Sequence, residues 1–100
     1  MELKPGKRLR SAVCSTELMV VKAPATAIQL VCGGTPMYAP GEAVPVGSLD
    51  PRFATGTLIG KRYVHDSGLE VLCTKPGDGS LSVDGEILVE KDAKPLPASD

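Results

Sequence analysis

The chain has 100 residues, a formal net charge of −1 and only three aromatic side chains, which are two tyrosines and one phenylalanine. This length suits one small domain, or two half-domains that share a core. A net charge so close to zero gives no general attraction for nucleic acid or for an anionic membrane. Few aromatic side chains leave little material for base stacking, so nucleic acid is not an expected partner.

The first five residues are charged and contain a proline, and no apolar signal segment follows them. No run approaches the ~18 apolar residues of a membrane helix. Three cysteines, an odd number, favour free thiols or metal ligands over a disulfide framework. These features predict a cytoplasmic protein that does not bind membranes and whose oligomeric state is open.

The chain holds 11 glycines and 9 prolines, which recur too often for a long helix. The apolar segments between them are short and rich in β-branched residues, as is typical of strands. The sequence therefore predicts an all-β protein, a small antiparallel β domain. The expected strands are 7–13, 17–22, 27–31, 61–64, 69–74, 80–83 and 86–90.

Two of these strands carry more specific expectations. Residues 17–22 are apolar on both faces, which predicts a central strand covered on both sides. Residues 27–31 are expected to return antiparallel to it and to deliver Cys32. Asp84 and Gly85 form a two-residue hairpin signal, because a type I′ turn needs positive φ at both central positions.

The prolines and glycines that interrupt secondary structure predict the domain organisation. Residues 1–38 form one β unit, 39–55 a Pro/Gly-rich linker, 56–91 a second unit without a cysteine knuckle, and 92–100 a flexible tail, all within one compact domain. The halves echo each other in three segments: Gly6–Leu9 with Gly60–Tyr63, Leu18–Pro24 with Val71–Pro76, and Leu30–Gly33 with Ser82–Gly85. The offset between them falls from about 54 to about 52 residues. Either the units are tandem repeats packed as a pseudo-dimer, or two hairpins of similar size share a common pattern.

The segment Leu30–Met37 places a cysteine at a glycine turn and a Pro-Met pair after it, and Cys14 lies one hairpin earlier. This arrangement resembles desulforedoxin and the desulforedoxin-like domain that opens desulfoferrodoxins, over about a third of the chain. In that family two cysteine pairs hold iron with four thiolates, and desulforedoxin is a small dimer. Cys14 and Cys32 match one cysteine of each pair. Ser11 and Gly33 stand where the other two would be, so the resemblance implies a degenerate metal site.

A zinc or iron–thiolate site normally has four N or S ligands. Cys14 and Cys32 supply two of them, and Cys73, His65 or a partner would have to complete the set. The leading expectation is that no cofactor is bound, with zinc or iron as the alternative. A reversible dithiol formed by the same two cysteines is a second chemical interpretation. Cys73 is otherwise expected to be a small core residue, and His65 a solvated turn histidine.

No motif of catalytic residues is present, so an enzyme is not the favoured interpretation. The sequence favours a non-catalytic binding or accessory module for a partner protein. The alternative is a residual metal-binding or thiol-redox protein, similar to an electron-transfer protein, that acts through Cys14 and Cys32. Basic residues at equivalent positions of the two units are expected either to form one basic strip for an acidic partner or to be a solvated edge strand protected by charge. They are Lys7, Arg8, Arg10, Lys61 and Arg62.

Overall fold

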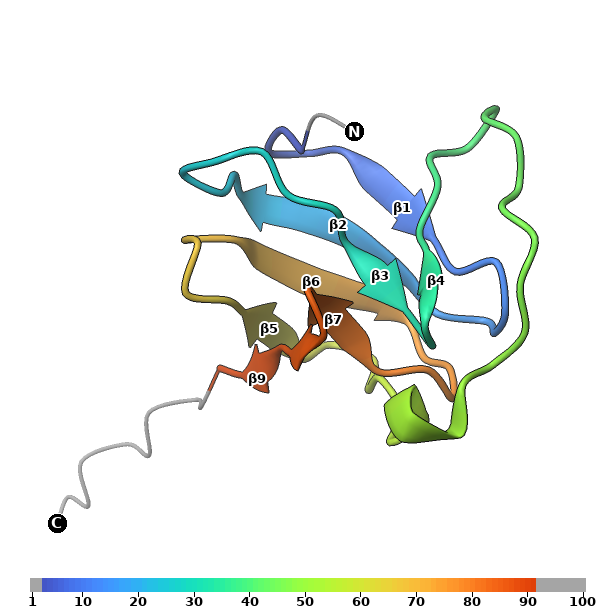
Figure 1. Ribbon diagram of the computed structural model, residues 1–100. Coiled ribbons are helices and arrows are strands. Elements are labelled where there is room, and N and C mark those ends of the chain that lie inside the picture. Colours follow the sequence, from blue (N-terminus) through green and yellow to red (C-terminus); the bar gives the residue numbers. More distant parts are fainter. Residues whose placement is uncertain (1–2, 92–100) are drawn as a thin grey trace, which may run out of the picture.

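The computed structural model describes residues 3–91, which form two antiparallel β-sheets (Figure 1). The strands are Arg8–Arg10 (β1), Glu17–Lys22 (β2), Val31–Cys32 (β3), Thr35–Pro36 (β4), Arg62–Val64 (β5), Glu70–Lys75 (β6), Leu81–Val83 (β7), Glu86–Ile87 (β8) and Val89–Glu90 (β9). The first sheet has the order β1-β2-β6-β5-β9 and the second the order β4-β3-β7-β8. The predicted all-β class is confirmed. The tail predicted over 92–100 lies outside the described residues.

The two longest strands, β2 and β6, lie side by side in the middle of the first sheet (Figure 1). Their side chains alternate, as the pleat requires. Leu18 and Val20 of β2 point into the core, while Met19 on the other face is only half-buried. The prediction that 17–22 would be covered on both faces is therefore wrong. The second sheet packs against the face that carries Leu18 and Val20, and no described strand or helix lies over the opposite face, where Met19 is half-buried.

The core is made almost entirely of aliphatic side chains, as the scarcity of aromatic residues requires. Fully burying one such side chain stabilises the fold by about 1.5–3 kcal/mol. Both halves of the chain contribute side chains to this one core. The buried apolar residues are Leu3, Leu9, Leu18, Val20, Leu30, Cys32, Met37, Tyr63, Leu69, Val71, Cys73, Leu81, Val83 and Leu88.

The expectation that residues 27–31 would return antiparallel to 17–22 is wrong. Only Val31 and Cys32 are in a strand, and this strand, β3, pairs with β4 and β7 in the second sheet. The amide of Ala25 donates to the carbonyl of Ser67 (2.6 Å), which ties the turn after β2 to the β5–β6 turn. The chain therefore crosses to the second sheet instead of closing a hairpin on β2.

The two sheets are joined at both sides. Arg10 and Tyr38 form an isolated antiparallel bridge, with N···O distances of 2.8 and 3.1 Å, between the end of β1 and the chain after β4. On the other side the chain runs from β8 into β9, which pairs with β5 of the first sheet. The sequence predicted one strand over 86–90, but the buried Leu88 divides it. The predicted hairpin turn is present, with φ of 51° at Asp84 and 81° at Gly85.

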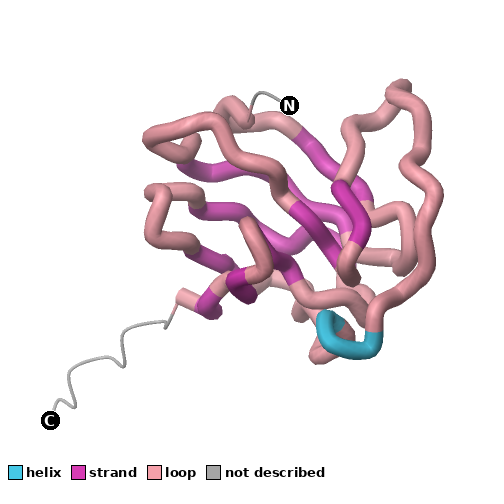
Figure 2. Tube along the Cα trace, in the orientation of Figure 1, coloured by secondary structure: helices cyan, strands magenta, loops and turns pink. Residues whose placement is uncertain are grey.

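Figure 2 shows the strands at the centre of the molecule and loops around them. A long loop follows Tyr38 and ends at a 3₁₀ helix, Pro51–Phe53, the only helix within residues 3–91. Asp50 caps this helix, because its carboxylate accepts a hydrogen bond from the Arg52 amide (2.9 Å). The Asp50 amide also donates to the carbonyl of Gly33 (2.9 Å), which fixes the loop beside the β3–β4 turn. None of the described helices is long and apolar enough to span a bilayer.

Candidate functional site

Three loops meet around a pair of thiols. Cys14 lies in the loop between β1 and β2, and Cys32 is the last residue of β3. Their sulfur atoms are 3.8 Å apart. Cys32 is completely buried, whereas Cys14 is partly exposed. The loop between β6 and β7 covers the pair.

The β1–β2 loop is shaped by the Ser11 side chain. Its hydroxyl oxygen accepts hydrogen bonds from the amides of Val13 (3.2 Å) and Cys14 (3.1 Å). The amide of Ser11 donates to the carbonyl of Thr16 (2.9 Å) and closes the loop at its base. A short hydroxyl side chain that bonds to the backbone two or three residues onward is a common way to stabilise a tight turn. The turn places the Cys14 sulfur 3.2 Å from the Ser11 oxygen.

The β3–β4 turn depends on two glycines. Gly33 and Gly34 have φ values of +64° and +85°, which a side chain at either position would disfavour. A Cβ at Gly33 would also lie 2.7 Å from a methyl carbon of Val13 and 2.8 Å from one of Leu49. Apolar side chains therefore occupy the space around the position that matches the fourth cysteine of the resembled family.

Backbone of the β6–β7 loop lies directly against the sulfurs. The amide of Gly79 donates to the Cys14 sulfur (3.3 Å), and the Gly79 carbonyl accepts from the Thr57 hydroxyl (2.6 Å). A Cβ at Gly79 would be 2.9 Å from the Cys32 sulfur and 3.1 Å from that of Cys14. A Cβ at Gly77 would lie 2.5 Å from the Thr16 backbone nitrogen and 3.1 Å from the Cys14 sulfur. Glycine is required at these two positions by close approach, not by a positive φ.

Hydrogen bonds make Cys14 the more acidic thiol. Burial by itself would raise its pKa, but the hydroxyls of Ser11 and Thr16, with the amides of Thr16 and Gly79, lower that pKa to about 7. The two hydroxyl oxygens lie 3.2 and 3.3 Å from the Cys14 sulfur, and each can donate its proton to a thiolate. A large fraction of Cys14 is therefore a thiolate at neutral pH.

Cys32 is shifted in the opposite direction. Burial raises the pKa of its thiol to about 12, and the negative charge of the Cys14 thiolate adds to this rise. Cys32 therefore keeps its proton at neutral pH. The site holds one accessible thiolate beside one buried thiol, which is an unequal pair.

This inequality predicts a pH profile. Alkylation of Cys14 by iodoacetamide is expected to rise with pH and to reach half its maximal rate near pH 7, because only the thiolate reacts. A Ser11→Ala variant loses a stabilising donor, so its midpoint is expected at higher pH. Mass spectrometry of the intact protein after timed quenching measures both rates. Thr26→Ala, away from the sulfurs, is the control. A midpoint near the ordinary thiol value of 9.0 in the wild type would contradict the assignment.

The described residues supply only part of a tetrahedral thiolate site. Two thiolates on one zinc ion, with bonds of about 2.3 Å, would be about 3.8 Å apart, which suits Cys14 and Cys32. The two other family positions are Ser11, a poor ligand, and Gly33. Within residues 3–91 no group of three or more His, Cys, Asp and Glu side chains is placed to hold a metal ion. These residues do not fit a four-ligand iron or zinc site, and a two-thiolate site stays a prediction that needs outside ligands.

The two further ligand candidates point elsewhere. The buried thiol of Cys73 donates to the carbonyl of Lys75 (3.2 Å). His65 accepts or donates at both ring nitrogens, to the Ser67 hydroxyl (2.9 Å) and to the Glu86 carboxylate (3.0 Å). Its side chain is only 13% exposed, so the expectation of a solvated turn histidine is wrong. Glu86 lies at the start of β8, directly after the Asp84-Gly85 turn.

The five basic residues do not form one continuous strip. Arg8 and Arg10 are on β1 and Arg62 is on β5, and β2 and β6 lie between these two strands. Lys7 and Lys61 precede the two strands. The sequence predicted equivalent positions for the cationic groups, but it did not predict that two strands would lie between them.

Three site residues were missed by the sequence analysis: Thr16, Gly77 and Gly79. Thr16 is completely buried beside the sulfurs, yet threonine in a loop carries no specific signal. The segment 75–79 has the composition of a solvent-exposed turn. Nothing in its spacing reveals that it packs on cysteines about 45–65 residues earlier in the chain.

A comparison of the chain with models of known protein families, with curated proteins and with solved structures found no match.

Proposed function

We propose that this protein is a thiol–disulfide redox protein in which Cys14 and Cys32 alternate between two thiols and one disulfide. The observation that carries the proposal is the 3.8 Å separation of one accessible and one fully buried sulfur. A disulfide needs this distance to fall to about 2.05 Å. The approach is short, and the pair requires no third residue.

The reaction has two steps. The Cys14 thiolate attacks one sulfur of a disulfide substrate, which releases the other half as a thiolate and leaves a mixed disulfide on Cys14. Cys32 then loses its proton and attacks the Cys14 sulfur. The Cys14–Cys32 disulfide forms and the remaining half of the substrate leaves as a thiolate. Counted from the fully protonated pair, the protein gives up two electrons and two protons, and the two substrate thiolates take up these protons to become two thiols.

The unequal environments of the sulfurs support these roles. An accessible sulfur with a low pKa makes the first attack, and a buried neighbour resolves the mixed disulfide. The Gly79 amide and the Ser11 and Thr16 hydroxyls stabilise a negative charge on Cys14. They also stabilise the same sulfur as a leaving group when the disulfide is reduced again.

The test is equilibration of the full chain in glutathione buffers of graded redox poise, followed by acid quenching, alkylation and mass measurement. The expected oxidised product is monomeric, has lost two hydrogen atoms and exposes one alkylatable thiol after unfolding, that of Cys73. Three alkylatable thiols at every poise would overturn the proposal. Elemental analysis of protein purified in reductant serves as the control. About one zinc or iron per chain would favour the metal-binding alternative instead.

We also propose that the chain consists of two tandem β units packed as a pseudo-dimer, the first of them similar to desulforedoxin. The central pairing of β2 with β6, flanked by β1 and β5, supports this arrangement. Two ion pairs support it as well: Glu17 with Lys75 and Glu70 with Lys22, both at 3.9 Å. An offset of 53 residues converts Glu17 into Glu70 and Lys22 into Lys75, so each pair is the image of the other.

A binding role toward a partner protein and a cytoplasmic location are retained as proposals. A reducing compartment would keep Cys14 and Cys32 as thiols until an oxidant arrives, which agrees with a redox function. The partner-binding role is supported by the open face of the first sheet, which contains none of the residues around the two sulfurs.

A further inference from the structure

The first sheet has one face that no described element covers. We name it the outer face and define it by Arg8, Met19, Leu72 and Arg62. These residues are consecutive cross-strand partners: Arg8 pairs with Met19, Met19 with Leu72, and Leu72 with Arg62. Cross-strand partners lie on the same face of a sheet. An aliphatic pair therefore lies between two arginines whose strands are about 14 Å apart.

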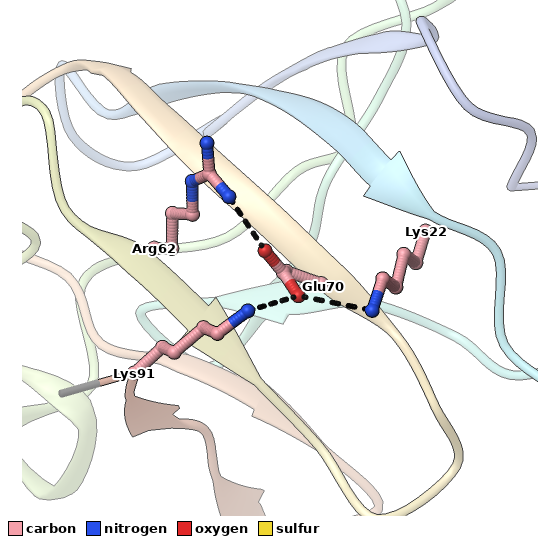
Figure 3. A network of polar contacts seen from close by, with 4 residues as sticks. All are labelled: Lys22, Arg62, Glu70 and Lys91. Carbon is pink, nitrogen blue, oxygen red and sulfur yellow. Dashed lines mark hydrogen bonds and ion pairs between the residues drawn. The ribbon is translucent and has the colours of Figure 1, made fainter. Parts of the chain in front are cut away.

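Each end of the outer face carries a carboxylate surrounded by cations. At one end Glu17 lies 3.9 Å from both Arg10 and Lys75. At the other end Glu70 contacts Arg62 (3.3 Å), Lys91 (3.2 Å) and Lys22 (3.9 Å), as Figure 3 shows. The three cations reach Glu70 from both neighbouring strands and from the end of β9.

The carboxylates anchor the cations without neutralising the face. Only 4% of the Glu70 side chain is exposed, while its three cationic partners are each about half exposed or more. Burial would raise the pKa of Glu70, but Lys91, Lys22 and Arg62 lower it, so the carboxylate is ionised. With Arg8 included, the face has six cations and two carboxylates, although the whole chain has a net charge of −1. Positive charge is thus concentrated on one side of the molecule.

The centre of the face is apolar and half-buried. Met19, Val21 and Leu72 are neither fully exposed nor covered. A hollow of about 530 Å³ adjoins Met19 at one end of the face, and Arg8, Pro40 and Thr74 also line it. Methionine and arginine are enriched in protein interfaces, and methionine adapts to the shape of its partner.

We propose that the outer face binds an acidic segment of a partner protein. Its carboxylates meet Arg8 and Arg62, and an apolar side chain between them packs on Met19 and Leu72. Arg8 forms no ion pair with any described residue, so its guanidinium is available to the partner. The proposal is independent of the redox function, because it uses none of the sulfur-site residues.

The chemistry of the face favours protein over the two other anionic partners. Nucleic-acid binders stack bases on exposed aromatic side chains, whereas Tyr38, the aromatic residue paired with Arg10 at one end of this face, is half-buried. Membrane binders project large apolar side chains beyond the surface, whereas Met19 and Leu72 are half-buried between charged neighbours. A polypeptide with alternating acidic and apolar residues matches both the charge and the centre.

The experiment measures fluorescence anisotropy of a fluorescein-labelled peptide of alternating glutamate and leucine, titrated with the full chain. Saturable binding that weakens at higher salt is expected. The Arg8→Gln/Arg62→Gln variant is expected to bind roughly tenfold more weakly. Its matched control, Arg52→Gln/Lys61→Gln, removes the same charge outside the face and is expected to bind like the wild type.

Arg8→Glu is a second variant that breaks no ion pair with a described residue, and it is expected to weaken binding at an unchanged melting temperature. Equal loss in the matched control would show general charge attraction and overturn the proposal. Absence of peptide binding would also overturn it. Labelled oligothymidine and phosphatidylserine vesicles are titrated in parallel. Tighter binding of either one than of the peptide would assign the face to that partner instead.

Discussion

A Cys32→Ser variant is expected to capture glutathione on Cys14 and to hold it. In the wild type the Cys32 sulfur, 3.8 Å from that of Cys14, resolves the mixed disulfide. Serine cannot perform this attack, so only a second molecule of thiol can release the adduct. Because well-placed intramolecular groups have very high effective concentrations, the adduct is expected to last at least about a hundredfold longer in the variant. Intact-mass measurement after exposure to oxidised glutathione follows the adduct over time.

Two matched variants complete this experiment. Cys14→Ser is expected to give no adduct in the folded protein, because Cys32 and Cys73 are buried. Cys73→Ser is expected to behave like the wild type, since its sulfur bonds to the Lys75 carbonyl and not to the pair. An adduct that resolves equally fast with and without Cys32 would remove the basis for the redox function.

A Gly79→Ala variant is expected to lose about 1–3 kcal/mol of stability, the usual cost of overpacking a filled site. The added Cβ would lie 2.9 Å from the Cys32 sulfur and 3.0 Å from the Gly33 amide nitrogen. The loop must therefore move, and its amide bond to Cys14 is weakened. Thermal unfolding followed by circular dichroism is expected to show a melting temperature lower by roughly 5–15 °C. The midpoint for Cys14 alkylation is expected to move upward with it.

Gly85→Ala separates packing from backbone strain. No atom lies within 4 Å of a Cβ at this position, but its φ is +81°. The variant is expected to lose about 1 kcal/mol through the backbone alone and to keep the wild-type alkylation profile. If Gly79→Ala retained both the stability and the thiol midpoint of the wild type, the β6–β7 loop would have no role at the sulfurs.

Local patterns were sufficient for part of the fold. The strand predicted over 17–22 has the bounds of β2, because a short run of apolar and β-branched residues is a local property. The Asp84-Gly85 turn was predicted for the same reason, since positive φ at both positions is a property of two residues. The approach of Cys14 to Cys32 followed from the family resemblance, not from composition or periodicity.

Long-range contacts explain what the sequence did not reveal. β3 pairs with β7 and not with β2, so its position depends on a strand in the second half of the chain. Met19 and Val21 make the open face of β2 apolar, and the sequence therefore predicted that this face would be covered. No described strand or helix covers it. In the sequence, Gly77 and Gly79 resemble ordinary turn residues. The structure shows that glycine is needed there because the backbone packs directly against the sulfurs and Thr16.

The pairing of β2 with β6 and of β3 with β7 has a consequence for how the chain folds. Leu18 pairs with Cys73, and Val31 pairs with Ser82, so both central ladders join residues more than fifty positions apart. Domains dominated by such distant pairings fold in milliseconds to seconds, because loop-closure entropy is lost before native contacts compensate for it. The second half must arrive before Gly79 covers Cys14 and Cys32. The unequal acidity of the two thiols is therefore a property of the completed fold. The rate of Cys14 alkylation at neutral pH can be used to follow folding.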